Sequence, residues 1–428
     1  MALVLPGGGA RGAYEVGALS VLLPLLEQRG ERPVILCGTS VGAINATALG
    51  ATADRPAQEA VDSLLSRWRA LRKSDVIRPV VGPWLPLTAL RMVGEALELP
   101  GVRLAGLLDP APLKGSIDRW VDWDALGRNV RQEIIQAACV VATSLERSGP
   151  VAFVDTAGRV PPSRPADPIQ YVPARLDGAH VRASAAIPML FPPVHVEQPR
   201  ALAGHYVDGG TRLNSPVSPA LALGAERVVV IGFQPFRARM EKPASGGGAP
   251  RLADVAANII DGLLVDQVVD DVHRLAAVNA FFVEDQTTGG SRAARSYRTA
   301  RGHAPYRKVS YAIVAPGEHG EIGRLATDRL AAAYGGLRGL REPDYALFGL
   351  LLGGHSASRG ELLSFLFFDE DYIRDLIDAG RRDAERWLAR HPRLWCADPA
   401  HDLGVDVGDP NALAETRTLE EWRDLRRR

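Results

Sequence analysis

A pentapeptide near the N-terminus has the residue types and spacing of a hydrolytic nucleophile. Gly38-Thr39-Ser40-Val41-Gly42 has the GxSxG pattern and lies between an apolar run and an Ala-rich helical pattern, a context that exposes a serine on a sharp turn. The glycines Gly38 and Gly42 let the chain turn without Cβ clashes. The helix that follows favours negative charge at its N-terminus. The alternative is that Ser40 only caps this helix.

A glycine-rich loop precedes the pentapeptide. In Gly7-Gly8-Gly9-Ala10-Arg11-Gly12, consecutive backbone amides can point at an anion, as in an oxyanion hole. The loop also contains GxGxxG, but a dinucleotide site needs an acidic residue at the end of the second strand. That strand, Val34–Cys37, runs into the serine turn, and Glu31 precedes it. The loop therefore supports Ser40 as a nucleophile over Ser40 as a cap.

A serine nucleophile needs a base, and the sequence offers two kinds. Asp208 follows an apolar lead-in and precedes Gly209 and Gly210, which allow close backbone approach, and it would act directly as half of a dyad. Its alternative role is an ordinary turn aspartate. Of nine histidines, His195 and His205 lie nearest to a structured turn and would complete a conventional triad. Residue types alone leave the choice open.

Alternating patterns predict the elements that position these residues. Short apolar runs alternate with helical patterns, which predicts βαβ units, a mainly parallel sheet and helices on both faces. The expected strands are Leu3–Leu5, Val34–Cys37, Ala138–Thr143, Val151–Asp155, Arg227–Phe233 and Val309–Val314, and the first helices are about Ala13–Gln28 and the segment after Ser40.

Composition excludes several classes of protein. Fifty basic and fifty acidic residues cancel without a basic cluster, which argues against nucleic acid as a partner. Cys37, Cys139 and Cys396 are too few and too widely spaced for a disulfide framework or a zinc site, so we expect a cytoplasmic protein without a metal. No apolar stretch reaches the roughly 20 residues of a membrane span, although contact with a membrane surface is compatible with the sequence.

Several segments lie outside these patterns. The segment Leu64–Leu108 is helical, Pro-interrupted and apolar around Trp84–Met92; we interpret it as an insertion and favour ordinary packing over a lipid-facing lid. Glu241–Pro250 and Thr287–Ala304 have loop composition. Ile313–Arg428 is mainly helical in pattern.

In their order along the chain, these motifs resemble the patatin-like phospholipase family. The resemblance rests on the glycine loop, the serine pentapeptide, Asp208-Gly209-Gly210, and the stretch from Ala183-Ser184-Ala185-Ala186-Ile187-Pro188 to Phe191-Pro192-Pro193. It implies a three-layer α/β/α sandwich, Ser40 as nucleophile, Asp208 as base without a histidine, and an oxyanion hole around Gly7, Gly8 and Gly9 with Arg11 nearby. Arg11 would support the loop, meet a lipid phosphate or form a surface ion pair.

The resemblance implies a lipid acyl hydrolase that uses no cofactor. Soluble esters or thioesters are alternative substrates, and a non-catalytic lipid-binding protein is the alternative from another class. We expect a catalytic core over residues 1–215, with the insertion at about 60–110. Residues 216–428 would form the rest of the sheet layer and a helical C-terminal region.

Overall fold

In the computed structural model, which describes residues 1–79, 106, 108–163, 168–235, 309–335, 343–345 and 357–396, nine strands form one sheet. The strands are β1 (Ala2–Leu5), β2 (Ile35–Thr39), β3 (Ala137–Ser144), β4 (Gly149–Thr156), β5 (Gln170–Pro173), β6 (Val194–Val196), β7 (Gly204–Asp208), β8 (Arg227–Ile231) and β9 (Ser310–Val314). Their order is β5-β4-β3-β2-β1-β8-β9, and β7 pairs with both β3 and β6.

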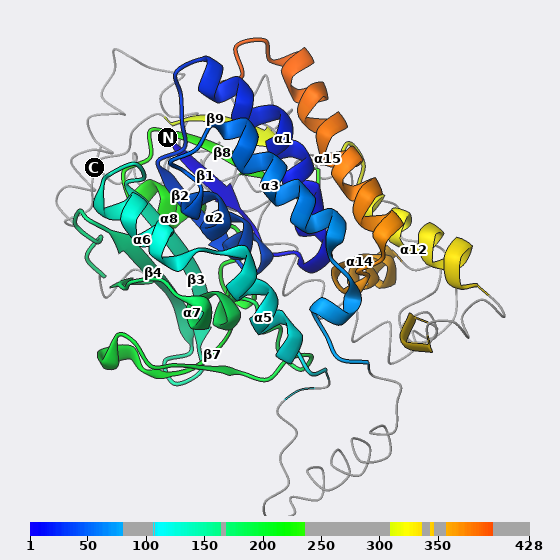
Figure 1. Ribbon diagram of the computed structural model, residues 1–428, viewed down its shortest axis with the longest axis horizontal. Coiled ribbons are helices and arrows are strands. Elements are labelled where there is room, and N and C mark those ends of the chain that lie inside the picture. Colours follow the sequence, from blue (N-terminus) through cyan, green and yellow to red (C-terminus); the bar gives the residue numbers. More distant parts are fainter. Residues whose placement is uncertain are drawn as a thin grey trace, which may run out of the picture.

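Helices cover this sheet (Figure 1). The α-helices are α1 (Gly12–Gln28), α2 (Val41–Ala51), α3 (Ala57–Ala70), α5 (Ala111–Trp120), α6 (Trp123–Arg131), α7 (Gly178–Ser184), α8 (Val217–Ala222), α12 (Glu321–Tyr334), α14 (Ala357–Leu366) and α15 (Glu370–Arg390). Short 3-10 turns are η1 (Gly9–Arg11), η2 (Lys73–Asp75), η3 (Arg200–Leu202) and η4 (Gly209–Thr211).

The centre of the sheet is parallel, as predicted. β1 pairs in parallel with β2 and β8, β2 with β3, and β8 with β9. Each of the six predicted strands overlaps an observed one. Two features differ from the sequence interpretation: β4 returns antiparallel along β3, and β5, β6 and β7 were not expected. These three strands are short, and none shows a long apolar run.

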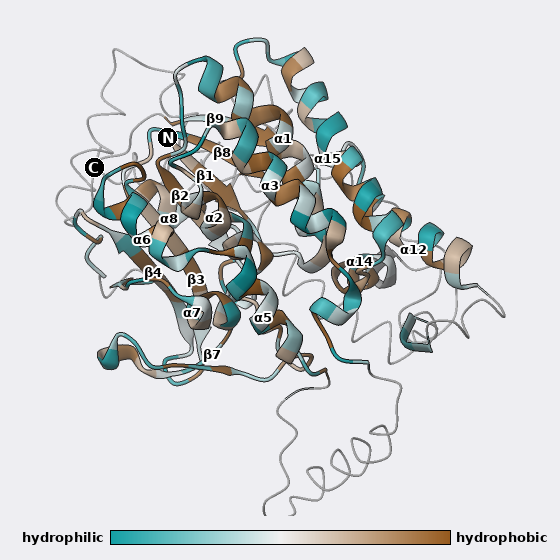
Figure 2. Ribbon diagram, in the orientation of Figure 1, coloured by the Kyte–Doolittle hydropathy of each residue, from teal (hydrophilic) through white to brown (hydrophobic). Residues whose placement is uncertain are grey.

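The layers follow from the crossovers. The chain moves from β1 to β2 to β3 in one direction, and right-handed crossovers therefore place α1 and α2 on one face. α8 follows the antiparallel strand β7 and packs against β1, β2 and β8. Helices therefore flank a mostly parallel sheet, in agreement with the predicted α/β/α sandwich. α1 is apolar along most of its length (Figure 2) and lies beneath α3 and α15.

The C-terminal region is helical in the described residues, as predicted, and returns to the sheet. α15 packs along α1, where the Tyr14 hydroxyl donates to Asp383 over 2.8 Å. Beyond α15, Cys396 and Tyr311 exchange two backbone hydrogen bonds of 2.8 Å, which attach this end to β9. The boundary near residue 215 stays a prediction, although β8 and β9 belong to the same sheet as the first strands.

Three of the sequence predictions fall outside the described residues: the apolar stretch Trp84–Met92 and the loops Glu241–Pro250 and Thr287–Ala304. Within the described part of the chain, no helix combines the length and apolar character needed to cross a membrane.

Candidate active site

Ser40 lies at the turn between β2 and α2 in a backbone conformation that non-glycine residues rarely adopt. Its φ is 53° and its ψ is −122°, a strained geometry that the surrounding structure must enforce. It occupies the N-cap position of α2, but its side chain makes no capping hydrogen bond, which argues against a purely capping serine. Gly42 permits the tight turn, since a Cβ there would lie 2.1 Å from the Leu5 carbonyl oxygen.

β3 brings Ser40 and Asp208 together, because two strands share one of its edges. Thr39, the last residue of β2, is the register partner of Val141, and Asp208, the last residue of β7, is the partner of Ala142. β2 runs parallel to β3 and β7 runs antiparallel to it, so the two strands end at the same point along that edge. Residues 168 positions apart in sequence therefore meet.

The Ala-Ser-Ala-Ala-Ile-Pro block contacts both ends of this junction. The Ser184 hydroxyl accepts the amide hydrogen of Ser40 over 2.8 Å and donates to the Val141 carbonyl over 2.5 Å. The Ala186 carbonyl accepts the amide of Asp208 over 2.8 Å. The block therefore holds the backbone of Ser40 and of Asp208 in place through uncharged groups, a hydroxyl and a carbonyl.

The Asp208 carboxyl is buried and has a pKa near neutral pH. Only 2% of the residue is exposed, and burial raises its pKa from 3.8 to about 7. The Ser40 hydroxyl and the Gly210 amide, which donates to Oδ1 over 2.7 Å, act in the opposite direction by favouring the carboxylate. Gly209 and Gly210 begin η4 directly after this residue. A carboxyl with this pKa can accept and return a proton near neutral pH.

The three glycine amides of the loop differ in their partners. The Gly7 amide donates to the Asn214 side-chain oxygen over 2.9 Å, so Gly7 anchors the loop, and its place in the oxyanion hole stays a prediction. Among the described residues, the amides of Gly8 and Gly9 have no hydrogen-bond acceptor. Gly9 has a φ of 57° and has no space for a Cβ, which would lie 2.2 Å from the Phe365 carbonyl oxygen.

Arg11 is turned away from solvent and into the protein. Its side chain is buried and forms hydrogen bonds and an ion pair with Glu361 and Ser364 of α14. Of the three roles that the sequence left open, this contact fits support of the loop. A contact with a lipid phosphate and a surface ion pair are both incompatible with its burial.

An apolar pocket opens at Ser40. It holds about 590 Å³ of empty space, counting the open solvent at its mouth. Its walls come from α2, α3, α5, the segment after α7 and the end of α14, and include Trp68, Leu71, Ile117, Trp120, Phe365 and Phe368. Besides Ser40 and the tryptophans, Ser116 is the one residue with a polar side chain in the described part of the lining, and its hydroxyl donates to the Asp75 carbonyl. Such a surface suits an acyl chain.

Among the described residues that line this pocket, none is a histidine. His195 and His205 face each other across the β6–β7 pair with ring centroids 5.0 Å apart, and the ring of His205 contacts Glu146. His180, which sequence reasoning passed over, is buried in α7, where Nδ1 meets Asp177 and Nε2 meets the Gln198 carbonyl. The geometry therefore favours Asp208 over a histidine as the partner of Ser40.

Sequence reasoning missed some residues that shape the site. Ser184 lies in a block that was noted only for its resemblance, and Asn214 follows Asp208 by six positions with no motif of its own. Glu361, Ser364 and Phe365 lie more than 300 residues from the loop that they contact. No local signal could have identified these α14 residues, because their role arises from tertiary packing.

The comparisons with known proteins bear on the same part of the chain. The family model described as Patatin-like phospholipase matches residues 3–221, just over half of the 428 residues. No curated protein matches the chain. Among solved structures, VipD from Legionella pneumophila is similar, with 12% identity and a TM-score of 0.33 over 91% of this chain and 67% of that one.

Proposed function

The chain belongs to the patatin-like phospholipase family, a family of lipid acyl hydrolases, and on that premise we propose that it hydrolyses acyl esters of lipids through a dyad of Ser40 and Asp208. One observation carries the proposal: the strained serine faces a buried carboxyl at the opening of an apolar pocket. Nucleophile, base and acyl site thus coincide.

The proposed reaction proceeds in two steps. Asp208 takes the proton of the Ser40 hydroxyl while Oγ attacks the ester carbonyl carbon, and the amides of Gly8 and Gly9 stabilise the oxyanion that forms. Asp208 then gives the proton to the departing alcohol, which leaves an acyl-serine. Water attacks this intermediate with Asp208 again as base, releasing the fatty acid and restoring the serine hydroxyl.

The pocket supports a lipid as the substrate over a small polar ester. An acyl chain would contact Trp68, Ile117 and Phe365, whereas a charged or hydrated acyl group would lose its water without gaining polar partners there. Hydrolysis of soluble esters or thioesters uses the same chemistry and remains the alternative.

Labelling with a fluorophosphonate probe tests the nucleophile. The wild-type protein should be labelled, and Ser40→Ala, which removes one buried oxygen, should fold normally and take up no label. A panel of p-nitrophenyl esters from acetyl to palmitoyl, together with phosphatidylcholine vesicles, then separates the substrates. Preference for the long acyl groups supports lipid hydrolysis. Labelling that persists in Ser40→Ala excludes Ser40 as the nucleophile.

A further inference from the structure

A helix more than 300 residues away in sequence holds the glycine loop, and the contact passes through Arg11. The guanidinium donates from Nε to the Ser364 hydroxyl over 2.7 Å and from one terminal nitrogen to the Glu361 carbonyl over 2.8 Å. The same nitrogen forms an ion pair with the Glu361 carboxylate. Both side chains of this pair are almost fully buried, so solvent does not screen the interaction.

The main chains of the loop and of α14 also touch. The Arg11 amide donates to the Gly8 carbonyl over 3.1 Å, which closes the turn that presents the free amides. Gly9 lies against the Phe365 carbonyl with no space for a side chain. The Arg11 guanidinium lies over the Phe365 ring, 4.2 Å from its centroid. A shift of α14 would therefore be transmitted directly to the loop.

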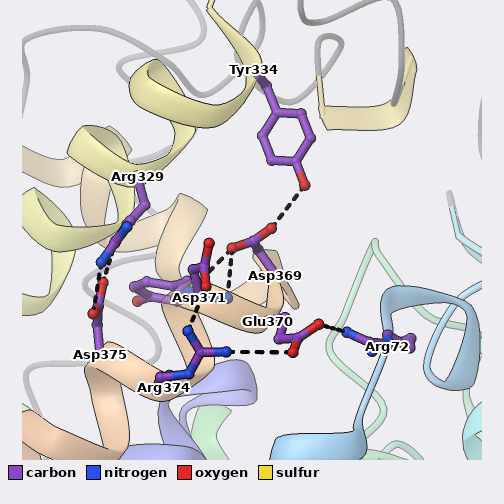
Figure 3. Close-up of polar contacts among 9 residues, drawn as sticks. Arg72, Arg329, Tyr334, Asp369, Glu370, Asp371, Arg374 and Asp375 are labelled. Atoms are coloured by element: carbon purple, nitrogen blue, oxygen red, sulfur yellow. Dashed lines mark hydrogen bonds and ion pairs between the residues drawn. The ribbon is translucent and has the colours of Figure 1, made fainter.

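The junction that follows α14 is itself fixed by several contacts. Figure 3 shows Asp369 accepting from the first backbone amides of α15 and from the Tyr334 hydroxyl of α12. It also shows ion pairs from Glu370 to Arg72 and from Asp375 to Arg329. These contacts link the segment after α14 to α12 and to the segment that follows α3.

A buried ion pair is a costly way to join two elements, because apolar side chains of similar size often join them with equal or greater stability. The charged pair adds a defined geometry, because a guanidinium bound to three fixed acceptors holds the backbone of Arg11 in one position. We propose that Glu361 and Ser364 are positioning residues that hold the Gly8 and Gly9 amides at the oxyanion through Arg11. This inference rests on the proposed function, which assigns those amides to the oxyanion.

It follows that the catalytic unit extends beyond residues 3–221, the part that matches the family model. α14 contributes both the anchor of the glycine loop and, through Phe365 and Leu366, part of the acyl pocket. The loop and the pocket thus share one wall, and a displacement of α14 changes the oxyanion amides and the acyl site together.

Two variants of the full-length chain test the inference. Glu361→Gln removes the charge but keeps the shape, and Ser364→Ala removes a single hydroxyl. Each should lower kcat on p-nitrophenyl butyrate, and the maximal rate of fluorophosphonate labelling, by about 10- to 100-fold, because misplacing one oxyanion donor has effects of this size. KM should change less than about threefold, since the pocket keeps its side chains. Asp124→Asn, which breaks the exposed ion pair between α6 and Arg175, should leave kcat unchanged.

The results separate positioning from general support. Variants that keep the wild-type kcat overturn the inference, as do variants whose kcat falls only in proportion to the fraction unfolded at the assay temperature. If Glu361→Gln does not fold, Ser364→Ala decides by the same criteria. A wild-type protein without Ser40-dependent labelling overturns the proposed function and this inference with it. Labelling at Ser40 that is equally fast in the variants overturns this inference alone.

Discussion

Replacing Asp208 by asparagine should abolish turnover and at the same time stabilise the protein above neutral pH. The pKa of this carboxyl is about 7 in the folded chain and near 3.8 when it is exposed. At pH values between 3.8 and about 7, the native state therefore keeps a proton on this carboxyl that the unfolded state has already released. The stability that this proton contributes is fully present below about pH 4 and is lost as pH rises through about 7. Asparagine cannot ionise and so avoids that loss.

The magnitude follows from the two pKa values. Complete ionisation of the buried carboxyl costs about 4 kcal/mol, of which about 3 kcal/mol falls between pH 5 and pH 8. The asparagine carbonyl can still accept the Gly210 amide, so little stability is lost in exchange. Reversible urea unfolding of both proteins at pH 5, 6, 7 and 8 should therefore show the free-energy difference moving in favour of Asp208→Asn by about that amount.

A matched control uses a carboxylate on the surface. Asp124 is exposed and pairs with Arg175, and Asp124→Asn should change stability by no more than about 0.5 kcal/mol at every pH. A difference between wild type and Asp208→Asn that stays constant from pH 5 to pH 8 would refute the argument from burial. Greater stability of wild type at pH 8 would refute it as well.

Three further measurements test other parts of the site. The value of kcat/KM should fall about tenfold for each pH unit below about 7 and level off above it, because the reaction needs ionised Asp208; a flat profile from pH 5 to 8 would contradict this. Gly9→Ala places a Cβ that would clash with Phe365, and it should lower kcat at least about 100-fold. The control is Gly30→Ala, which is also at positive φ but in open space. It should cost only about 1 kcal/mol of stability and leave activity unchanged. Leu113→Trp, in the wall of the pocket, should lower kcat/KM for palmitoyl esters about tenfold or more and leave acetyl esters within about threefold; equal losses on both would argue against an acyl pocket.

Local pattern was enough to locate the parallel centre of the fold. The apolar runs that form β1 and β2 have no charged residues, and each is followed by a glycine motif and a helix. Such a pattern specifies a strand, a turn and a helix without reference to the rest of the chain. Ser40 and the glycine loop were therefore assigned from the sequence to the ends of neighbouring strands.

Pairing between distant segments was not predictable in the same way. β7 has only two neighbouring apolar residues, Tyr206 and Val207, and its place beside β3 depends on register with a strand more than sixty residues earlier. From the sequence, Asp208 could be predicted as the base only from the two glycines that follow it and from the family resemblance. The region that contains α14 was expected to be mainly helical, but the contact of α14 with Arg11 depends on packing between segments more than 300 residues apart.

The proposed dyad makes chemical sense only because the site is buried. An exposed aspartate, with a pKa near 3.8, would be too weak a base for a serine hydroxyl near neutral pH, and histidine normally fills that role. Burial at the end of β7 raises the pKa of Asp208 to about 7, which brings a carboxyl to the range where histidine works. The same burial destabilises the ionised fold, and the strained φ of Ser40 adds to that cost. The surrounding sheet, whose β1, β2 and β3 are buried throughout, is what allows the protein to tolerate both.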